Sequence, residues 1–535
     1  MLTLPELNRR ATWTEERLQR WLKAFFTDER IVVLANREPF IHDRTDDGQL
    51  VVRRSSSGLV TALEPIVRAC SGVWVAHGSG NADRLVVDRR NGINVPPAAP
   101  QYRLRRVWLD DSEQQGYYYG FANEALWPLC HRTFVQPVFR SEDFNIYSTV
   151  NARFADAVRE EAKSASPLIL VQDYHFALAP QMIHERLPLS TVVAFWHIPW
   201  PGPHDFEICP WAPQLLKGLL GSHIVGFQTP SDCGNFMDSV ESTLDAGVDR
   251  EQGVINYAGR HTIVRAYPVS TEWPSQWVAQ APPIAECRES VRRELHLDAN
   301  VRLGVGVDRL DYTKGIAEKF LAVEQLLEAQ PELRREFAFV QIAEPSRGCL
   351  QAYRDIRSRV LAAAERINAR FGSGRHRPIV LLEARHEPQD VYRFLRAADF
   401  CYVGSLHDGM NLVAKEFVSA RDDDRGVLIL SRFTGAARQL TEALIVNPYA
   451  TDEVARALAD ALSMGVGEQS RRMRRMRSTV AEFSTYWWAG QMLQDAARLR
   501  QRRSVVPTVG RFPIRLPLPP PPGSPRGSTR QLTRS

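Results

Sequence analysis

The stretch GVDRLDYTKG, from Gly306 to Gly315, joins an apolar run to a pair of cations. The letters VRLGVGV that lead into it predict a buried strand. Arg309 and Lys314 then follow at its carboxyl end. In doubly wound sheets, ligands bind beyond these strand ends. Two cations at this place, with a glycine that allows close backbone approach, suit a diphosphate.

The same two cations have a simpler explanation. Asp308 and Asp311 lie beside them in the sequence, and surface ion pairs with these carboxylates would account for both. The stretch alone does not decide between a diphosphate site and such pairs.

Working outward, similar apolar runs alternate with helical periods along most of the chain. They are IVVLAN, GVWVAHG, LILVQD, TVVAFWH and HIVGFQT, then RLGVGV, FAFVQIA, PIVLLEA, FCYVGS, GVLILS and ALIVNP. This alternation predicts parallel sheets covered on both faces. A segment rich in proline and tryptophan, 270–283, separates the two series and predicts a hinge. We therefore expect an α/β protein with two doubly wound domains facing a central cleft.

The predicted organisation has five parts. They are an N-terminal helical extension (1–28), an N-terminal Rossmann-like domain (29–275), a C-terminal Rossmann-like domain (276–480), a helix returning toward the first domain (481–503) and a disordered tail rich in proline and arginine (504–535).

Composition excludes several classes of protein. The 535 residues are 44% hydrophobic and 24% charged, and no apolar run reaches the length of a membrane span. Seven arginines and no acidic residue follow Gln501, so the net charge of +5 becomes −2 without them. A near-neutral body argues against nucleic acid as a partner. Seven scattered cysteines without a CxxC pair and the lack of a signal peptide predict reduced thiols in a cytoplasmic protein without zinc.

A second motif, FCYVGSLHDGMNLVAKEF, reads as strand, turn and helix. The first backbone N–H groups of this helix, at Leu412 and Val413, would bind an anion. Glu416 lies one turn further on the same face and suits ribose hydroxyls, while Asp408 suits sugar hydroxyls. Helix capping by Asp408 or Asn411 is the alternative.

Polar residues also end strands of the first half. Asn36 and Arg37 end one predicted strand, Asp173 another and His197 a third. A lone buried histidine is usually structural, but several such strand ends in one domain predict a site.

These residues and motifs resemble a known family. DRLDYTKG, SRGCLQAY, DGMNLVAKE and EALIVNPY, together with FANEALWP, QDYHFAL and HIPWP, resemble trehalose-6-phosphate synthases among the retaining GT-B glycosyltransferases of family 20. The match covers roughly residues 30 to 500. It implies retaining glucosyl transfer from a nucleotide-glucose, UDP-glucose first, to glucose 6-phosphate. It also implies that residues 29–275 form the acceptor domain and residues 276–480 the nucleotide-sugar domain.

The resemblance assigns roles by motif. Catalytic residues would be His197, Arg309, Lys314 and Asp408. Donor-binding residues would be Ser57, Gly58, Arg309, Lys314, Asp408, Gly409, Met410, Asn411, Leu412, Val413 and Glu416. Acceptor-binding residues would be Arg37, Tyr118, Trp127, Asp173 and Arg347, with the two arginines on the phosphate. No metal or other cofactor is expected.

The chain departs from the family pattern at two places. Ser57 replaces the first glycine of a pair in the loop near the donor, and Ser270 and Thr271 stand where a glycine usually follows a strand. These departures leave the donor base and the acceptor open. Glucosylglycerol-phosphate synthase, which has the same scaffold and a smaller acceptor, and a non-catalytic sugar-phosphate sensor remain as rivals. A homo-oligomer and a trehalose-phosphate phosphatase acting downstream are further open partners, and no membrane partner is expected.

Overall fold

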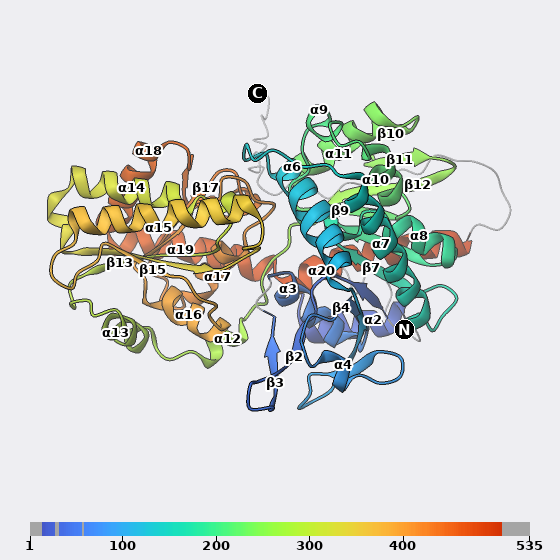
Figure 1. The fold of residues 1–535 in the computed structure, drawn as a ribbon, viewed down its shortest axis with the longest axis horizontal. Helices are drawn as coiled ribbons and strands as arrows, with labels where there is room; N and C mark the ends of the chain where they lie inside the picture. Colours follow the sequence, from blue (N-terminus) through green and yellow to red (C-terminus); the bar gives the residue numbers. More distant parts are fainter. Residues whose placement is uncertain (1–12, 27–30, 56–57, 506–535) are drawn as a thin grey trace, which may run out of the picture.

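The computed structural model of the chain describes residues 13–26, 31–55 and 58–505. Two α/β lobes lie side by side, with the earlier part of the sequence on the right of Figure 1 and residues from α13 to α19 on the left. The segments 1–12 and 506–535, which include most of the predicted tail, lie outside the described residues.

The first lobe contains a ten-stranded sheet in the order β10-β11-β12-β9-β8-β7-β1-β4-β6-β5. Neighbouring strands from β12 to β6 are parallel, and the β10–β11, β11–β12 and β5–β6 pairs are antiparallel. The strands are β1 (Val32–Leu34), β4 (Val73–His77), β5 (Gly92–Val95), β6 (Tyr102–Val107), β7 (Leu168–Gln172), β8 (Thr191–Phe195), β9 (Ile224–Phe227), β10 (Gly247–Asp249), β11 (Val254–Tyr257) and β12 (Arg260–Ala266).

Helices cover both faces of this sheet, and β2 (Phe40–Arg44) and β3 (Leu50–Arg54) form a separate hairpin beside α4 (Figure 1). The helices are α3 (Gly58–Ala69), α4 (Asp83–Val86), α5 (Asp111–Gln114), the π-helix η1 (Gln115–Leu126), α6 (Trp127–His131), α7 (Ser141–Glu161), the 3-10 turn η2 (Tyr174–Phe176), α8 (Ala179–Arg186), α9 (Pro203–Phe206), α10 (Ala212–Leu219) and α11 (Pro230–Thr243).

The second lobe contains a six-stranded, all-parallel sheet in the order β15-β14-β13-β16-β17-β18. The strands are β13 (Arg302–Arg309), β14 (Phe337–Glu344), β15 (Ile379–Leu382), β16 (Phe400–Val403), β17 (Val427–Ser431) and β18 (Leu444–Val446). Of these, β14, β16 and β17 are buried on both faces and carry the continuous apolar runs that such parallel strands require. This strand order is that of a dinucleotide-binding fold, so the predicted class with two doubly wound domains is confirmed.

The helices of the second lobe alternate with its strands. They are α12 (Gln276–Gln280), α13 (Ile284–Glu294), η3 (Tyr312–Lys314), α14 (Ile316–Ala329), η4 (Pro331–Arg334), α15 (Gln351–Phe371), α16 (Pro388–Ala397), α17 (Leu412–Ala420), η5 (Gly435–Arg438), α18 (Thr451–Ser463) and α19 (Val466–Glu482). None of the described helices is long and apolar enough to cross a membrane.

The two ends of the described chain pack together on the first lobe. Helix α20 (Thr485–Val505) runs back from the second lobe and contacts α3 and β8 (Figure 1). Helix α2 (Glu15–Phe25) packs beside it, burying Leu18, Trp21 and Leu22. Thr14 caps α2 by accepting a hydrogen bond from the Arg17 N–H at 3.3 Å.

Candidate active site

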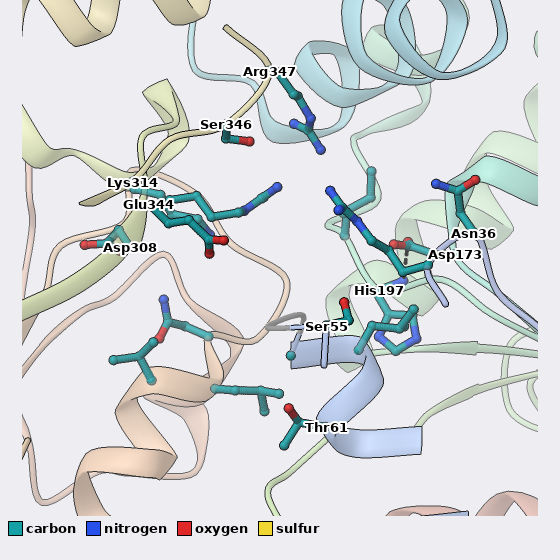
Figure 2. A pocket seen from close by; sticks show the side chains of 18 of the residues that line it. Asn36, Ser55, Thr61, Asp173, His197, Asp308, Lys314, Glu344, Ser346 and Arg347 are labelled. Carbon is teal, nitrogen blue, oxygen red and sulfur yellow. Dashed lines mark hydrogen bonds between the residues drawn. The ribbon is translucent and has the colours of Figure 1, made fainter. Parts of the chain in front are cut away.

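A cavity of about 660 Å³ lies between the two sheets, and both lobes contribute to its walls. Figure 2 shows Asn36, Asp173 and His197 on one side, Lys314 and Glu344 on the other, and Arg347 pointing in between them. The predicted residues that line it are Arg37, Gly58, Tyr118, Trp127, Asp173, His197, Arg309, Lys314, Arg347, Asp408, Met410, Asn411, Leu412, Val413 and Glu416.

Two of the predicted residues are exceptions. Gly409 is not in the cavity wall: a Cβ atom there would lie 2.1 Å from the backbone oxygen of His197, so only glycine lets the two lobes touch at this point. Ser57 lies outside the described residues.

The two cations of the opening motif are positioned by the end of β13 and by η3. Lys314 Nζ lies 2.5 Å from Asp408 Oδ2, and Arg309 Nη2 lies 3.5 Å from Asp311 Oδ2. Gly315 follows with φ +63°, and a Cβ atom at this position would clash with the backbone oxygen of Gly404. Of the two carboxylates considered from sequence, therefore, only Asp311 pairs with one of these cations.

Asp308 serves the core of the second lobe instead. Its carboxylate accepts from Lys319 Nζ at 2.5 Å and from Gln341 Nε2 at 3.0 Å. All three side chains are buried. Because Asp308 is engaged there, Lys314 pairs with Asp408 of the motif FCYVGSLHDGMNLVAKEF instead.

Asp311 is the shared anion of the site. It is fully buried and lies 3.5 Å from both Arg309 and Arg347. Burial alone would raise its pKa, but Arg309, Arg347 and Lys314 outweigh this and lower the pKa to about 2. One carboxylate thus stays ionised beneath three cations.

Helix α17 presents its N-terminus to the cavity, as the sequence predicts. Asn411, at φ +79°, caps it by accepting from the Ala414 N–H at 3.2 Å. The N–H groups of Leu412 and Val413 precede that bond, so they are the ones a ligand can reach. Glu416 lines the same wall, and burial raises its pKa to about 7.

Arg347 follows β14 and enters an aromatic cage from the first lobe. Its guanidinium lies 4.4 Å from the Trp127 ring and 5.9 Å from the Tyr118 ring, and it donates to the Tyr174 hydroxyl at 3.3 Å. Tyr353 of the second lobe also accepts from it. A residue of the second lobe thus completes the predicted acceptor site of the first.

Tyr118 lies in the π-helix η1. Helices of this form are rare overall, and many of those that occur lie at functional sites. Its hydroxyl accepts a hydrogen bond from Arg37 Nη2 at 3.1 Å, and its ring stacks on that of His175 with centroids 5.8 Å apart. Burial would raise the pKa of Tyr118, but Arg37, Arg347 and Arg309 outweigh it and lower the pKa to about 7.

Asp173 and His197 meet at the ends of β7 and β8. Asp173 Oδ1 accepts from the His197 backbone N–H at 3.1 Å, and Asp173 has φ +75°. Burial raises the pKa of Asp173 to about 7 and lowers that of His197 to about 3. His197 Nε2 lies 2.9 Å from the Gln172 amide oxygen, so the neutral ring carries its proton there.

Several lining residues were not predicted. Gln228 donates to the His197 carbonyl at 3.4 Å and accepts from the Val269 N–H at 3.0 Å. It directly follows β9 in the run HIVGFQT, so the strand-end argument that found Asp173 could have found it too. Trp277 and Tyr392 line the second lobe's wall from α12 and α16, where the sequence carries no strand-end signal.

Of the two departures from the family pattern, Ser57 lies outside the described residues, while Ser270 and Thr271 lie within them. Ser270 and Thr271 are buried, and neither hydroxyl has a hydrogen-bond partner among the described residues. Lys415 Nζ of α17 donates to the Val269 carbonyl just before them, at 2.6 Å. The segment therefore joins the two lobes at the back of the cavity.

Within the described parts of the chain, no group of three or more His, Cys, Asp or Glu side chains is arranged to hold a metal ion. The expected lack of a metal requirement stays a prediction.

Comparison with known proteins agrees with this architecture. The family model described as Glycosyltransferase family 20 matches residues 29–498. A trehalose-6-phosphate synthase of Mycobacterium avium (strain 104) is 37% identical over 484 residues, covering 89% of this chain and 96% of that one. One from Mycobacterium tuberculosis (strain ATCC 25618 / H37Rv) is 36% identical over 488 residues, with the same coverage.

Solved structures are similar over nearly the same span. An E. coli structure bound with UDP-2-fluoro glucose is 31% identical with a TM-score of 0.77, covering 88% of this chain and 99% of that one. A UDP-forming α,α-trehalose-phosphate synthase from Burkholderia xenovorans in complex with glucose-6-phosphate is 30% identical with a TM-score of 0.76, covering 87% and 99%. The predicted resemblance is confirmed, and the chain belongs to Glycosyltransferase family 20.

Proposed function

We propose that this chain transfers glucose from UDP-glucose to glucose 6-phosphate with retention of configuration, forming trehalose 6-phosphate and UDP. The relatives named trehalose-6-phosphate synthase and the two ligand-bound structures support it. The observation that carries it is that one cavity gathers cations from both lobes. Arg309 and Lys314 come from the second lobe, and Arg37 faces them from the first.

The donor diphosphate would lie between Arg309, Lys314 and the N–H groups of Leu412 and Val413. Lys314 now pairs with Asp408 at 2.5 Å. A diphosphate arriving at Lys314 would weaken that ion pair and leave the carboxylate free to accept from glucose hydroxyls. Glu416, Asp408 and the Gly409–Asn411 turn would then hold ribose and glucose.

His197 would contact the transferred glucose without acting as an acid or base. Burial keeps its pKa at about 3, so the ring is neutral at physiological pH. Its Nε2 proton is already held by Gln172. The charge on the leaving group would therefore be stabilised by Arg309 and Lys314 instead.

The acceptor phosphate would bind Arg37 and Arg347, since a guanidinium forms paired hydrogen bonds to phosphate oxygens. Trp127 and Asp173 would place the sugar ring. The acceptor hydroxyl attacks the anomeric carbon on the face the diphosphate leaves, and a departing phosphate oxygen takes its proton. Gly58 lies against Leu412, and its lack of a side chain would leave room for the donor there.

A product assay tests this proposal. Purified protein is incubated with UDP-, GDP- or ADP-glucose and with glucose 6-phosphate or glycerol 3-phosphate, and the products are identified by mass and NMR. We expect trehalose 6-phosphate from UDP-glucose and glucose 6-phosphate. Glucosylglycerol phosphate as the main product would favour the sibling synthase, and no transfer with any pair would favour a sensor.

Metal independence is tested in the same assay. Arg309 and Lys314 offer the positive charge that a metal ion otherwise brings to a diphosphate. We expect EDTA to leave turnover unchanged, and loss of turnover restored by Mg²⁺ would contradict this. The cytoplasmic location, a homo-oligomer and a phosphatase acting downstream stay predictions.

A further inference from the structure

Positive charge exceeds negative charge around Tyr118. Arg37 donates to its hydroxyl, and the guanidinium groups of Arg37 and Arg347 lie 6.0 and 5.9 Å from its ring. Arg309 is the third cation near it. The carboxylate that serves this cluster, Asp311, is divided between Arg309 and Arg347.

Among the described residues, the other groups around Tyr118 do not supply a full negative charge that would balance these arginines at neutral pH. His175 stacks on its ring, and burial keeps the pKa of that histidine far below its usual value. Tyr119 contacts it edge to face, and Tyr117 and Tyr174 lie nearby; burial raises the pKa of each of these phenols. Asp173, with a pKa raised to about 7 by burial, is at most partly ionised at neutral pH.

The Tyr118 hydroxyl therefore lies where the surrounding arginines would stabilise a negative charge. It accepts from Arg37 at 3.1 Å beside the Arg347 cage, where the proposed acceptor phosphate would also bind. A phenolate here would gain charge-assisted hydrogen bonds, and a phosphate dianion arriving at the same arginines would repel it.

We propose that Tyr118 loses its proton between Arg37 and Arg347 while the site is empty and regains it when a phosphate monoester binds. The O–H bond re-forms with a proton from the solvent, and no electrons are transferred. Phosphate binding is thus linked to the uptake of one proton at this phenol. The role of Arg37 and Arg347 in phosphate binding rests on the proposed function, but the ionisation of Tyr118 does not.

The first experiment needs no substrate. The near-ultraviolet absorbance of ionised tyrosine is followed against pH in the intact protein, in Tyr118→Phe and in Tyr119→Phe. Tyr118 is the one tyrosine of the described residues whose pKa is lowered, so we expect one phenol to ionise near pH 7 in the wild type. Tyr118→Phe should remove this phase and Tyr119→Phe should keep it.

Folding of the variants is checked by circular dichroism, and Arg37→Gln gives an independent reading. Removing that guanidinium should move the midpoint upward, because Arg37 is the largest of the charges lowering the pKa of Tyr118. A wild type in which no tyrosine ionises below about pH 9 would overturn the proposal, whatever the protein's activity.

The second experiment adds glucose 6-phosphate, glycerol 3-phosphate or inorganic phosphate at pH 8. We expect the phenolate absorbance to fall, and the acceptor KM to rise about tenfold per pH unit above about pH 7 in the wild type but not in Tyr118→Phe. A fall with glycerol 3-phosphate alone would support proton uptake while contradicting the proposed acceptor. A phenolate signal that all three compounds leave unchanged would overturn the proposal.

Discussion

Each arginine of the cleft is held by an aromatic ring as well as by a polar group. Trp127 lies under both Arg347 and Arg309, with 4.4 and 5.2 Å from guanidinium to ring centroid. Rings attract these cations without neutralising them. Since Arg309 and Arg347 share the single carboxylate of Asp311, the cluster keeps a net positive charge and a fixed geometry for an anionic ligand.

Arg347→Ala should raise the acceptor KM about 10- to 100-fold, since a charged hydrogen bond is worth about 1.5–3 kcal/mol. The KM for the nucleotide-glucose should change little. Arg359→Ala is a matched control, because that side chain is 63% exposed on α15 and pairs only with Glu318 among the ion pairs of the described residues. Equal effects of Arg347→Ala on both substrates, measured by steady-state kinetics, would contradict the assignment.

At this scale the sequence predicted which residues gather but not how they pair. Arg309, Lys314, Asp408 and Glu416 were all found from strand and helix ends, since the sheet brings those ends together. The partner of Lys314 could not be found this way. Asp408 is 94 residues further along, while Asp308 is nearer in sequence but is taken by Lys319.

Among the elements, two loops of the first lobe, strand β6 and helix α4 are held together by one buried network of ion pairs and hydrogen bonds. Arg106, at the end of β6, lies 2.7 Å from both Glu38 and Asp83. Glu38 also accepts from the Ser79 N–H and hydroxyl at 2.7 and 3.0 Å. Because Glu38 follows Arg37 directly, the network fixes the loop that carries this predicted phosphate ligand.

Arg106→Met should lower the free energy of unfolding by about 3–5 kcal/mol, because it leaves the buried carboxylate of Asp83 without its cation. Arg471→Ala, at a side chain 44% exposed on α19, should change it by less than about 0.5 kcal/mol. Urea unfolding measures both. Equal stability of the wild type and Arg106→Met would show that the network is not needed for folding.

The same network predicts a pH dependence. Burial raises the pKa of Glu38 from 4.5 to about 8, with Arg106 opposing and Asp83 adding to the rise. Protonated Glu38 therefore favours folding at low pH, and this contribution is lost as the pH rises from about 4.5 to 8.

Glu38→Gln, which stays neutral, should lack that loss. Its unfolding midpoint relative to wild type should rise across this range. A difference between the two proteins that is independent of pH would argue that Glu38 is ionised in the folded state throughout.

The elements show where sequence patterns stop being informative. Every apolar run named from the sequence forms a strand, because buried parallel strands need such runs. The β2–β3 hairpin was not predicted, because its strand LVVRR is exposed. The exposed fractions of Leu50, Val51 and Val52 are 47%, 39% and 40%. The π-helix at Tyr118 has no sequence signature that separates it from an α-helix.

Over the whole molecule, contacts across the cleft hold the lobes at this separation. His407 Nδ1 of the second lobe lies 2.6 Å from the His131 carbonyl oxygen of the first, and Arg438 donates to Ser231 Oγ at 2.8 Å. Helix α20 adds a covalent return to the first lobe, packing against α3. The lobes can therefore enclose both substrates at once, which excludes water from the transfer.

The N-terminal helix α2 lies before the family match and stabilises this return. Trp21 is 1% exposed and its ring stacks on Phe25 at 4.7 Å. Trp21→Ala should lower the free energy of unfolding by about 3–5 kcal/mol, while Lys23→Ala on the exposed face should not. Transfer activity of folded Trp21→Ala, measured at low temperature, should equal that of wild type; its loss would place α2 in the catalytic cycle.

The central claim is that Arg309 and Lys314 bind the diphosphate of the donor, while Arg37 and Arg347 bind the phosphate of the acceptor. A crystal structure with UDP and glucose 6-phosphate tests it most directly. We predict the diphosphate within about 3 Å of Lys314 Nζ and the Arg309 guanidinium, and the sugar phosphate between Arg37 and Arg347. A nucleotide bound away from Lys314, or a sugar phosphate that touches neither arginine, would contradict the account.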